Sequence, residues 1–368
     1  MESWTGVPFP WDRYAQAVCR EFKFGGMENT TLTILNDDLI EELPGDSDDL
    51  ILHEIAHSWC GNLVTCKTWE HLWLNEGWAT YCEALWFEHE GERKGGEDEA
   101  ARAYAENMMW LMDDVAETAS LTAPQEPSMA SLRWSHPDDV YGRPDNPYDK
   151  GAVVLHMLRA RLGDDLFQAG TRRYLERFAF REAETSDFRK ILEEVSGLSL
   201  ERFFTEWVER PGVPAVDVSV AWDEDAQSLE LTAAQTQPIN AANPTYTLDV
   251  PVQITLAGGA KVETQLALHG RTAQRTLTLP AEPEGVEIDP HATIVAAWNV
   301  TKARSLWRCQ RGADSAFSRI RADRAHGVPH DEPRRRQPHG CRCGSIHVHS
   351  ALASKWYRER PEHPTETP

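Results

Sequence analysis

Apolar residues recur at the spacing of an α-helix through the first two-thirds of the chain. The pattern predicts a helix over residues 48–62 and a second helix that opens at Asn75, as N-cap, and runs to Gly91. A Pro-rich loop is expected over residues 122–148. Five further segments carry an apolar stripe along one face and are expected to be helices: 100–117, 151–163, 167–179, 185–195 and 200–209.

Apolar and polar residues alternate in two other parts of the chain. Residues 14–36 are expected to form two strands joined by the Gly25-Gly26 stretch. After Pro211 the period falls to two, and short β-rich segments separated by turn residues follow at 216–222, 228–236, 246–256, 261–268, 275–280 and 293–300. Six such segments predict a small β-sandwich, so the expected fold class is α+β.

The C-terminal end breaks both patterns. Residues 304–325 could form one amphipathic helix, whereas the rest of the tail lacks periodicity and is rich in Pro, Arg and His, which predicts disorder. Residues 301–368 hold 14 Lys and Arg against 7 Asp and Glu, although the whole chain has a net charge of −22. We therefore expect three parts: a mostly helical domain over 1–212, a β-sandwich over 213–303, and one short helix with a disordered tail over 304–368.

Composition limits the classes of partner. The 368 residues are 41% hydrophobic and 26% charged, as in soluble globular proteins. The net charge of −22 should repel nucleic acid and anionic membranes, and no apolar run is long enough to span a bilayer, so neither is expected as a partner. Seven cysteines, an odd number, favour reduced thiols and a cytoplasmic location. The composition leaves the oligomeric state open.

His53-Glu54-Ile55-Ala56-His57 is an HExxH motif on the first predicted helix. Residues four apart share one helix face, so both imidazoles can bind one metal ion. The Glu54 carboxylate can approach a metal-bound water without binding the metal, and this donor set suits Zn²⁺. The motif alone is weak evidence, because chance produces roughly 0.05 copies in a chain of this composition. The two histidines could instead be core residues and Glu54 a solvated one.

Glu76 follows His57 with eighteen residues between them and stands at the start of the second predicted helix. Two helices joined by a short loop can lie antiparallel and bring this carboxylate to the histidine pair. Three protein ligands leave the fourth tetrahedral position open, which is typical of a catalytic rather than a structural site. We therefore expect one Zn²⁺ ion bound by His53, His57 and Glu76.

Four motifs in order connect the chain to a known family. Gly25-Gly-Met-Glu-Asn29, HEIAHSW, WLNEGW and the PYDKG sequence at 147–151 together resemble the gluzincin aminopeptidases, the family of aminopeptidase N and the leukotriene hydrolases. The resemblance runs from about residue 5 to about residue 303. It implies a thermolysin-like, mostly helical catalytic domain with a partial β-sheet, and a zinc-dependent hydrolase of peptides with a free N-terminus.

The resemblance also implies roles for single residues. Glu54 would be the general base, and Tyr148 the phenol that donates a hydrogen bond to the tetrahedral oxyanion. Glu28 would anchor the free α-amino group of the substrate. Glu28 lies within a backbone stretch along which an extended peptide could add as a strand: Gly25, Gly26, Met27, Glu28 and Asn29. Read alone, that stretch is interpreted as a hairpin turn.

Two further residues near the motifs carry open alternatives. Glu83 lies two helical turns after Glu76, on the same face, and could accept a hydrogen bond from a ligand histidine. It could equally be a solvated glutamate. Tyr141 is interpreted as a loop-packing residue, although it lies near Tyr148 in sequence.

The chain departs from the family at both ends. A β-rich domain normally precedes this catalytic domain, and the chain is expected to lack it together with the first strands of the catalytic sheet. The basic tail is interpreted as a shift of reading frame near residues 309–330. A second metal site formed by Cys341, Cys343, His347 and His349 is not favoured, because the spacing matches no standard zinc module.

The leading hypothesis is therefore a zinc-dependent aminopeptidase. A thermolysin-like endopeptidase is an alternative, which Glu28 argues against, since an anionic amine anchor would block internal peptide. An inactive fragment, or a scaffold-type relative that binds zinc without turnover, is the alternative from another class. Lipid-epoxide hydrolysis, as in the leukotriene hydrolases, depends on pocket details beyond the sequence.

Overall fold

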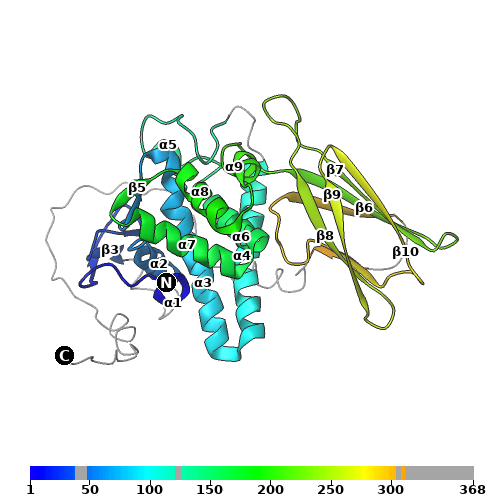
Figure 1. Ribbon diagram of the computed structural model, residues 1–368, viewed down its shortest axis with the longest axis horizontal. Coiled ribbons are helices and arrows are strands. Elements are labelled where there is room, and N and C mark those ends of the chain that lie inside the picture. The colour runs from blue at the N-terminus through cyan, green and yellow to red at the C-terminus, as the bar shows by residue number, and fades with distance from the viewer. Residues whose placement is uncertain (38–47, 121–125, 304–307, 312–368) are drawn as a thin grey trace.

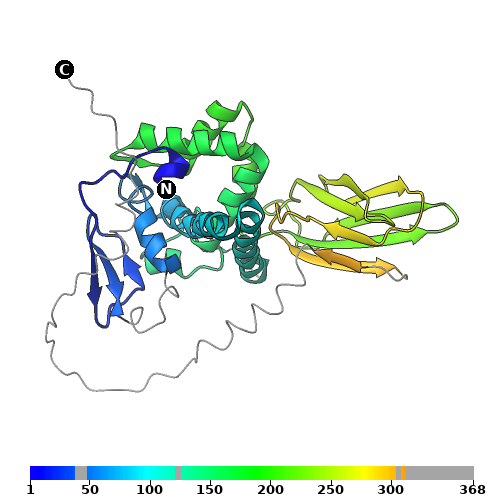
Figure 2. The same ribbon diagram turned by 90° about the horizontal axis from the view of Figure 1, so that it is seen from below.

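The computed structural model describes residues 1–37, 48–120, 126–303 and 308–311. A helical part occupies the middle, a small N-terminal sheet lies on one side of it, and the C-terminal strands extend from the other side (Figures 1 and 2). The predictions for residues 312–368, which are disorder, a frame shift and a second metal site, lie outside the described residues. Within the described ranges, no helix combines the length and the apolar character that crossing a membrane requires.

The helical part is built around α3, which packs against α2, α4 and α6. The helices are α1 (Glu2–Thr5), α2 (Asp48–Ala56), the 3₁₀ helix η2 (Trp69–Leu74), α3 (Glu76–Gly95), α4 (Glu97–Ser120), α5 (Asp138–Tyr141), α6 (Asp149–Leu162), α7 (Asp164–Phe178), α8 (Thr185–Ser196) and α9 (Glu201–Trp207). Each of the five predicted stripes coincides with one of α4, α6, α7, α8 and α9 to within three residues at either end. Aromatic side chains fill the core between them, with Trp73, Trp78 and Phe188 fully buried.

Helix α2 ends six residues earlier than the sequence predicts. After Ala56 the chain tightens, because Ser58 N donates to Ile55 O at 3.0 Å in a 3₁₀-type turn. Gly61, with φ 134°, then turns the chain toward β4 (Val64–Cys66). Gly61 therefore belongs to this second turn and not to the end of the helix.

Helix α3 begins at Glu76 as predicted, yet Asn75 does not cap it with its side chain. The Asn75 Oδ1 atom instead accepts a hydrogen bond at 3.0 Å from the backbone N–H of Cys66. This bond ties the loop after α2 to the start of α3. The helix also runs four residues past Gly91, to Gly95.

The N-terminal sheet has three strands, so the prediction of two strands was wrong in number. Its order is β1 (Gln16–Cys19), β3 (Thr33–Asn36), β2 (Gly26–Met27), with β1 parallel and β2 antiparallel to β3. The glycine stretch is therefore not only a connection, because Gly26 and Met27 pair with β3. Strand β2 lies against α2. A separate short pairing joins β4 in parallel to β5 (Arg181–Ala183).

The C-terminal strands form two four-stranded sheets, ordered β10-β7-β6-β12 and β13-β11-β8-β9. Their bounds are β6 (Ala215–Asp223), β7 (Ser228–Gln235), β8 (Leu248–Thr255), β9 (Lys261–Leu268), β10 (Thr272–Thr278), β11 (Gly285–Ile288), β12 (Ala297–Ala303) and β13 (Arg308–Arg311). Alternate side chains of β6, such as Val216, Val218 and Val220, are buried in the core, as the period of two predicted.

Two strands depart from the prediction. β11 is only four residues long and was not predicted. β13 overturns the expected helix 304–325 at residues 308–311, because this segment pairs in parallel with β11, whose edge would otherwise be open. The remainder of that expected helix lies outside the described residues.

A buried hydrogen-bond chain links the helices to the C-terminal strands. His156 Nε2 lies 2.8 Å from the carbonyl oxygen of Ala292, which can only accept, so Nε2 carries the proton. His156 Nδ1 therefore accepts from Tyr104 Oη at 2.8 Å, and Tyr104 in turn accepts from Tyr81 at 3.0 Å. Burial lowers the pKa of His156 to about 4, so this neutral arrangement holds at physiological pH.

Candidate metal centre

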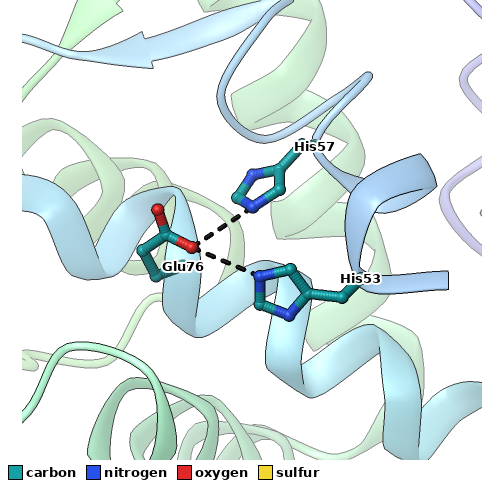
Figure 3. A group of neighbouring side chains, drawn as sticks. All are labelled: His53, His57 and Glu76. Carbon is teal, nitrogen blue, oxygen red and sulfur yellow. Dashed lines mark hydrogen bonds and ion pairs between the residues drawn. The ribbon is translucent and has the colours of Figure 1, made fainter. Parts of the chain in front are cut away.

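His53, His57 and Glu76 converge where α2 ends and α3 begins. The Nε2 atoms of the two histidines lie 3.3 and 3.2 Å from the same oxygen of Glu76, Oε2 (Figure 3). One ligand atom from each residue lies within 4.8 Å of the others. The fold thus brings together the three residues that the motif spacing selected.

Each histidine is held by a hydrogen bond on its outer nitrogen. His53 Nδ1 lies 2.9 Å from Glu83 Oε1, and His57 Nδ1 lies 2.9 Å from the carbonyl oxygen of Cys60. Both partners accept, so each Nδ1 carries a proton and Nε2 is the nitrogen that faces Glu76. A bound metal ion would replace the proton on Nε2, while each Nδ1–H keeps its hydrogen bond. The Cys60 carbonyl was not found from the sequence, because the turn that presents it forms only where α2 ends early.

The carboxylates around the two histidines favour positive charge at this point. Burial lowers the pKa of His53, but the hydrogen bonds that His53 donates to Glu76 and Glu83 outweigh it and raise the pKa to about 10. Burial raises the pKa of Glu76, but the His57 and His53 charges outweigh it and lower the pKa to about 2. Two imidazole nitrogens and one carboxylate oxygen are a donor set that fits Zn²⁺ with an open fourth position.

Glu54 lies beside the three candidate ligands but is not one of them. Its side chain is buried, and its Oε2 atom has no hydrogen-bond partner in the described part of the chain. Burial raises the pKa of the Glu54 carboxyl to about 7, against the His57 and His53 charges. A carboxyl with a pKa near neutrality can both take and return a proton at physiological pH.

Gly26 makes room for Glu54. A Cβ on Gly26 would meet the Glu54 carboxylate and would lie 2.6 Å from its Cγ. Strand β2 can therefore pass next to α2 only without a side chain at this position. The sequence pattern alone indicated a hairpin turn here, whereas the structure shows that Gly26 lies in β2 and abuts the candidate base.

The rest of the Gly25–Asn29 stretch lies along the same side of the centre. Asn62 Nδ2 donates to the Glu28 carbonyl oxygen at 2.7 Å, which fixes the stretch to the turn after α2. The Glu28 side chain is half-buried, and its charge contributes to the raised pKa values of Glu54 and Tyr148. Met27 is half-buried, and Gly25 and Asn29 are exposed. Their contact with substrate remains a prediction.

Tyr148, the residue before α6, closes the centre on the side of His53. Its ring stacks on the His53 ring at 6.0 Å between centroids and 17° between planes. Tyr141 lies 6.2 Å from Tyr148 and 6.0 Å edge-on from Trp69. Burial, together with the charge of Glu76, raises the pKa of Tyr148 above its ordinary value, so the phenol is protonated and can donate. The contact with Tyr148 places Tyr141 near the centre as well as in loop packing.

Comparisons of the chain with a family profile and with known proteins point to the same family. Residues 1–207 match a family profile described as "Peptidase family M1 domain". The chain is 29% identical over 337 residues to aminopeptidase N of Streptomyces lividans, which covers 86% of this chain and 35% of that one. It is 28% identical over 289 residues to aminopeptidase M1-B of Oryza sativa subsp. japonica, which covers 76% of this chain and 31% of that one.

The fold is similar to that of Legionella pneumophila aminopeptidase A in complex with aspartic acid, with a TM-score of 0.63 and 18% sequence identity. That similarity covers 83% of this chain and 33% of the other. The chain spans about a third of the length of the relatives it matches. The family profile and the relatives agree with the four motifs, and the chain belongs to peptidase family M1.

Proposed function

We propose that the chain is a zinc-dependent aminopeptidase that hydrolyses the N-terminal peptide bond of peptides. The observation that carries the proposal is the convergence of His53, His57 and Glu76, with both Nε2 atoms facing inward, beside a buried Glu54 oxygen that has no hydrogen-bond partner in the described chain. Membership of peptidase family M1 and the aminopeptidase names of the relatives support the peptide substrate.

Zinc held by these three residues would polarise the scissile carbonyl and acidify a water molecule. Glu54 takes the proton of the attacking water at its carboxylate and passes it to the leaving amine. Tyr148 donates from its phenol to the oxygen of the tetrahedral intermediate. Glu83 holds the His53 ring through Nδ1, 2.9 Å away, and thereby fixes which nitrogen faces inward.

The Glu28 carboxylate supplies the preference for a free N-terminus. It is half-buried next to the centre and carries a charge opposite to that of an α-ammonium group. Among the described strands, β2 has a partner on one side only, since it ends the order β1-β3-β2, and this outer edge lies beside Glu28. An extended peptide can pair with Gly26 and Met27 there and present its amino group to Glu28.

A cytoplasmic location stays part of the proposal. It rests on the cysteines, because Cys19, Cys60, Cys66 and Cys82 are all free in the described structure.

Hydrolysis of Leu-p-nitroanilide and its N-acetylated form by the zinc-loaded protein tests the function. We expect cleavage of the free amine only. Glu28→Gln should raise KM for the free amine by about tenfold or more, because a charge-assisted hydrogen bond is lost. The matched control is Glu21→Gln, which changes an exposed glutamate before β2 and should leave KM unchanged.

The other outcomes separate the alternatives. Equal cleavage of the acetylated substrate would remove the role of Glu28 and favour an endopeptidase. No turnover, with one zinc ion bound per chain, would identify a protein that binds zinc without catalysis.

A further inference from the structure

Gly77 and Gly151 touch backbone to backbone where α3 and α6 begin. A Cβ on Gly77 would lie 2.7 Å from Gly151 Cα and 3.1 Å from the carbonyl oxygen of Pro147. A Cβ on Gly151 would lie 2.7 Å from Gly77 Cα. Because carbon atoms pack at about 3.5–4.0 Å, either methyl group would push the helix ends apart by roughly 0.8 Å or more.

The backbone conformation of these residues does not require glycine. Both lie in the first turn of a helix, and neither has a positive φ. Glycine is less favourable than alanine inside a helix. Glycine is therefore required at Gly77 and Gly151 because the two helices approach each other closely there.

This contact joins two parts of the candidate centre. Gly77 directly follows Glu76, a candidate metal ligand, and Gly151 lies three residues after Tyr148. Pro147, whose carbonyl oxygen faces Gly77, directly precedes Tyr148. A displacement at the contact would thus act on the residues that flank Tyr148.

A buried ion pair also holds the segment that carries Tyr148. Lys150 Nζ donates to both carboxylate oxygens of Asp145 at 2.7 Å and to the Gly212 carbonyl oxygen at 3.0 Å. Asp145 also accepts from the backbone N–H groups of Gly212 and Met129, at 3.2 and 3.0 Å. Breaking a buried ion pair leaves an uncompensated charge, so Lys150 and Asp145 are expected to stay in place. A methyl group at the Gly77–Gly151 contact would therefore displace the residues that lie between this contact and Asp145, which include Tyr148.

The Tyr148 phenol has no hydrogen bond that would fix it independently, as far as residues 1–37, 48–120, 126–303 and 308–311 show. Within the same ranges, the aromatic rings next to it are those of His53 and Tyr141. The position of the hydroxyl therefore depends on where the backbone before α6 lies.

We propose that the Gly77–Gly151 contact sets the position of the Tyr148 hydroxyl relative to the candidate metal ligands. Gly77 and Gly151 are then positioning residues for the phenol, and the inference rests on the proposed role of Tyr148 as donor. A misplacement of about 1 Å in an active site can cost about 10²-fold in rate.

A set of four variants tests the proposal by hydrolysis of Leu-p-nitroanilide: Gly151→Ala, Tyr148→Phe, the two combined, and Gly91→Ala. Gly91→Ala is the matched control, because its Cβ would lie 2.7 Å from the Glu99 carbonyl oxygen and 2.8 Å from Ala100 Cα. It creates the same kind of clash on α3, the helix that carries Gly77, but roughly 22 Å from Glu76.

Gly151→Ala should lower kcat by roughly 10–100-fold, with KM within about twofold and the bound zinc unchanged. Gly91→Ala should change kcat by less than about twofold. In the Tyr148→Phe background, Gly151→Ala should lower kcat by less than about threefold, because the group that it displaces is gone. An equal loss in both backgrounds, or loss of zinc in Gly151→Ala, would overturn the proposal.

A measurement without turnover separates this inference from the proposed function. Protein labelled with 3-fluorotyrosine gives a ¹⁹F resonance for Tyr148, assigned by its absence in Tyr148→Phe. In the zinc-free protein this resonance should shift in Gly151→Ala and stay in place in Gly91→Ala. A wild type without turnover would defeat the proposed function, whereas an unmoved resonance would defeat the inference.

Gly77→Ala replaces Gly151→Ala if the latter does not fold, since it places its methyl group against Pro147 and Gly151 from the α3 side. If neither variant folds while Gly91→Ala does, the contact serves stability alone and the proposal is overturned.

Discussion

Two buried carboxylates, one in each part of the molecule, are treated in opposite ways. Asp289, after β11, accepts hydrogen bonds at 2.8–2.9 Å from Thr293 N, Thr293 Oγ1 and Ile294 N. Glu54 in α2 keeps a buried oxygen without a partner in the described chain, and burial raises its pKa to about 7. An unsatisfied buried carboxylate costs free energy. The Asp289 carboxylate thus contributes to stability, whereas Glu54 keeps an energetic cost that its proposed role as general base explains.

The largest expected effect is on catalysis by Glu54. Glu54→Gln should lower kcat on Leu-p-nitroanilide by about 10²–10⁴-fold, because the amide cannot take a proton. The same change should leave the Tm of the zinc-free protein unchanged or raise it, since a neutral group replaces a buried carboxyl that lacks a partner. Steady-state kinetics and thermal unfolding measure both.

Glu224→Gln, an exposed glutamate in the turn after β6, is the control for Glu54→Gln and should change neither quantity. A clear fall in Tm for Glu54→Gln would contradict the comparison, because it would mean that Glu54 stabilises the fold as Asp289 does.

The next effect in size is on stability and lies in the sheets. Leu231 on β7 is fully buried in the apolar core. Leu231→Ala should lower the free energy of unfolding by about 2–5 kcal/mol through lost burial and the cavity left behind. The kcat of the folded fraction should stay as in the wild type, because no proposed catalytic residue lies on this strand. Urea unfolding and kinetics on the same preparation check this, and a parallel fall in kcat would show that the sheets support the centre.

The same contrast explains how far the sequence predicts the fold. Along β6 the alternation of Val216, Val218 and Val220 is local, so a period of two identifies the strand directly. β11 was not predicted, because four residues are too few to show a period. The expected helix at residues 308–311 failed because a sheet edge, distant in sequence, supplied hydrogen-bond partners to the backbone.

In the candidate centre, the sequence predicts the residues but not the contacts that hold them in place. The spacing of His53, His57 and Glu76 follows from chemistry that requires one helix face and one further helix start. The Cys60 carbonyl that holds His57, and the closeness of Gly26 to Glu54, depend on how α2 ends and how β2 packs. Such contacts join segments whose relative position is set by tertiary packing, which no local pattern encodes.

A smaller effect is expected at the junction between the two parts. The folded His156 has a pKa of about 4 because it is buried, whereas an unfolded histidine has a pKa near 6.5. Between these values the unfolded chain binds a proton that the folded chain does not, so stability falls as the pH drops from 6.5 to 4 and is unaffected above 6.5. The full loss is about 3 kcal/mol.

His156→Gln keeps a donor for the Ala292 carbonyl but does not titrate, so its stability should lose about 3 kcal/mol less over the same pH range. Urea unfolding at several pH values measures the difference. His269→Gln, an exposed histidine of the C-terminal strands, should not alter the pH dependence in this way. Parallel pH curves for wild type and His156→Gln would show that the junction does not depend on a neutral histidine.

The smallest expected effect concerns Glu83. It tests whether this carboxylate stabilises the fold, as Asp289 does, or supports the candidate metal centre. Its Oε1 lies 2.9 Å from His53 Nδ1, so a carboxylate there orients the ring and strengthens the inward nitrogen as a ligand. Glu83→Gln should weaken zinc binding by about 10–100-fold, measured by competition with a chromophoric chelator. Glu92→Gln, exposed on the same helix, removes the same charge away from His53 and should leave the affinity unchanged. If Glu83→Gln lowers the Tm of the zinc-free protein but binds zinc like the wild type, Glu83 is a structural acid, and the difference between the two regions narrows to Glu54 alone.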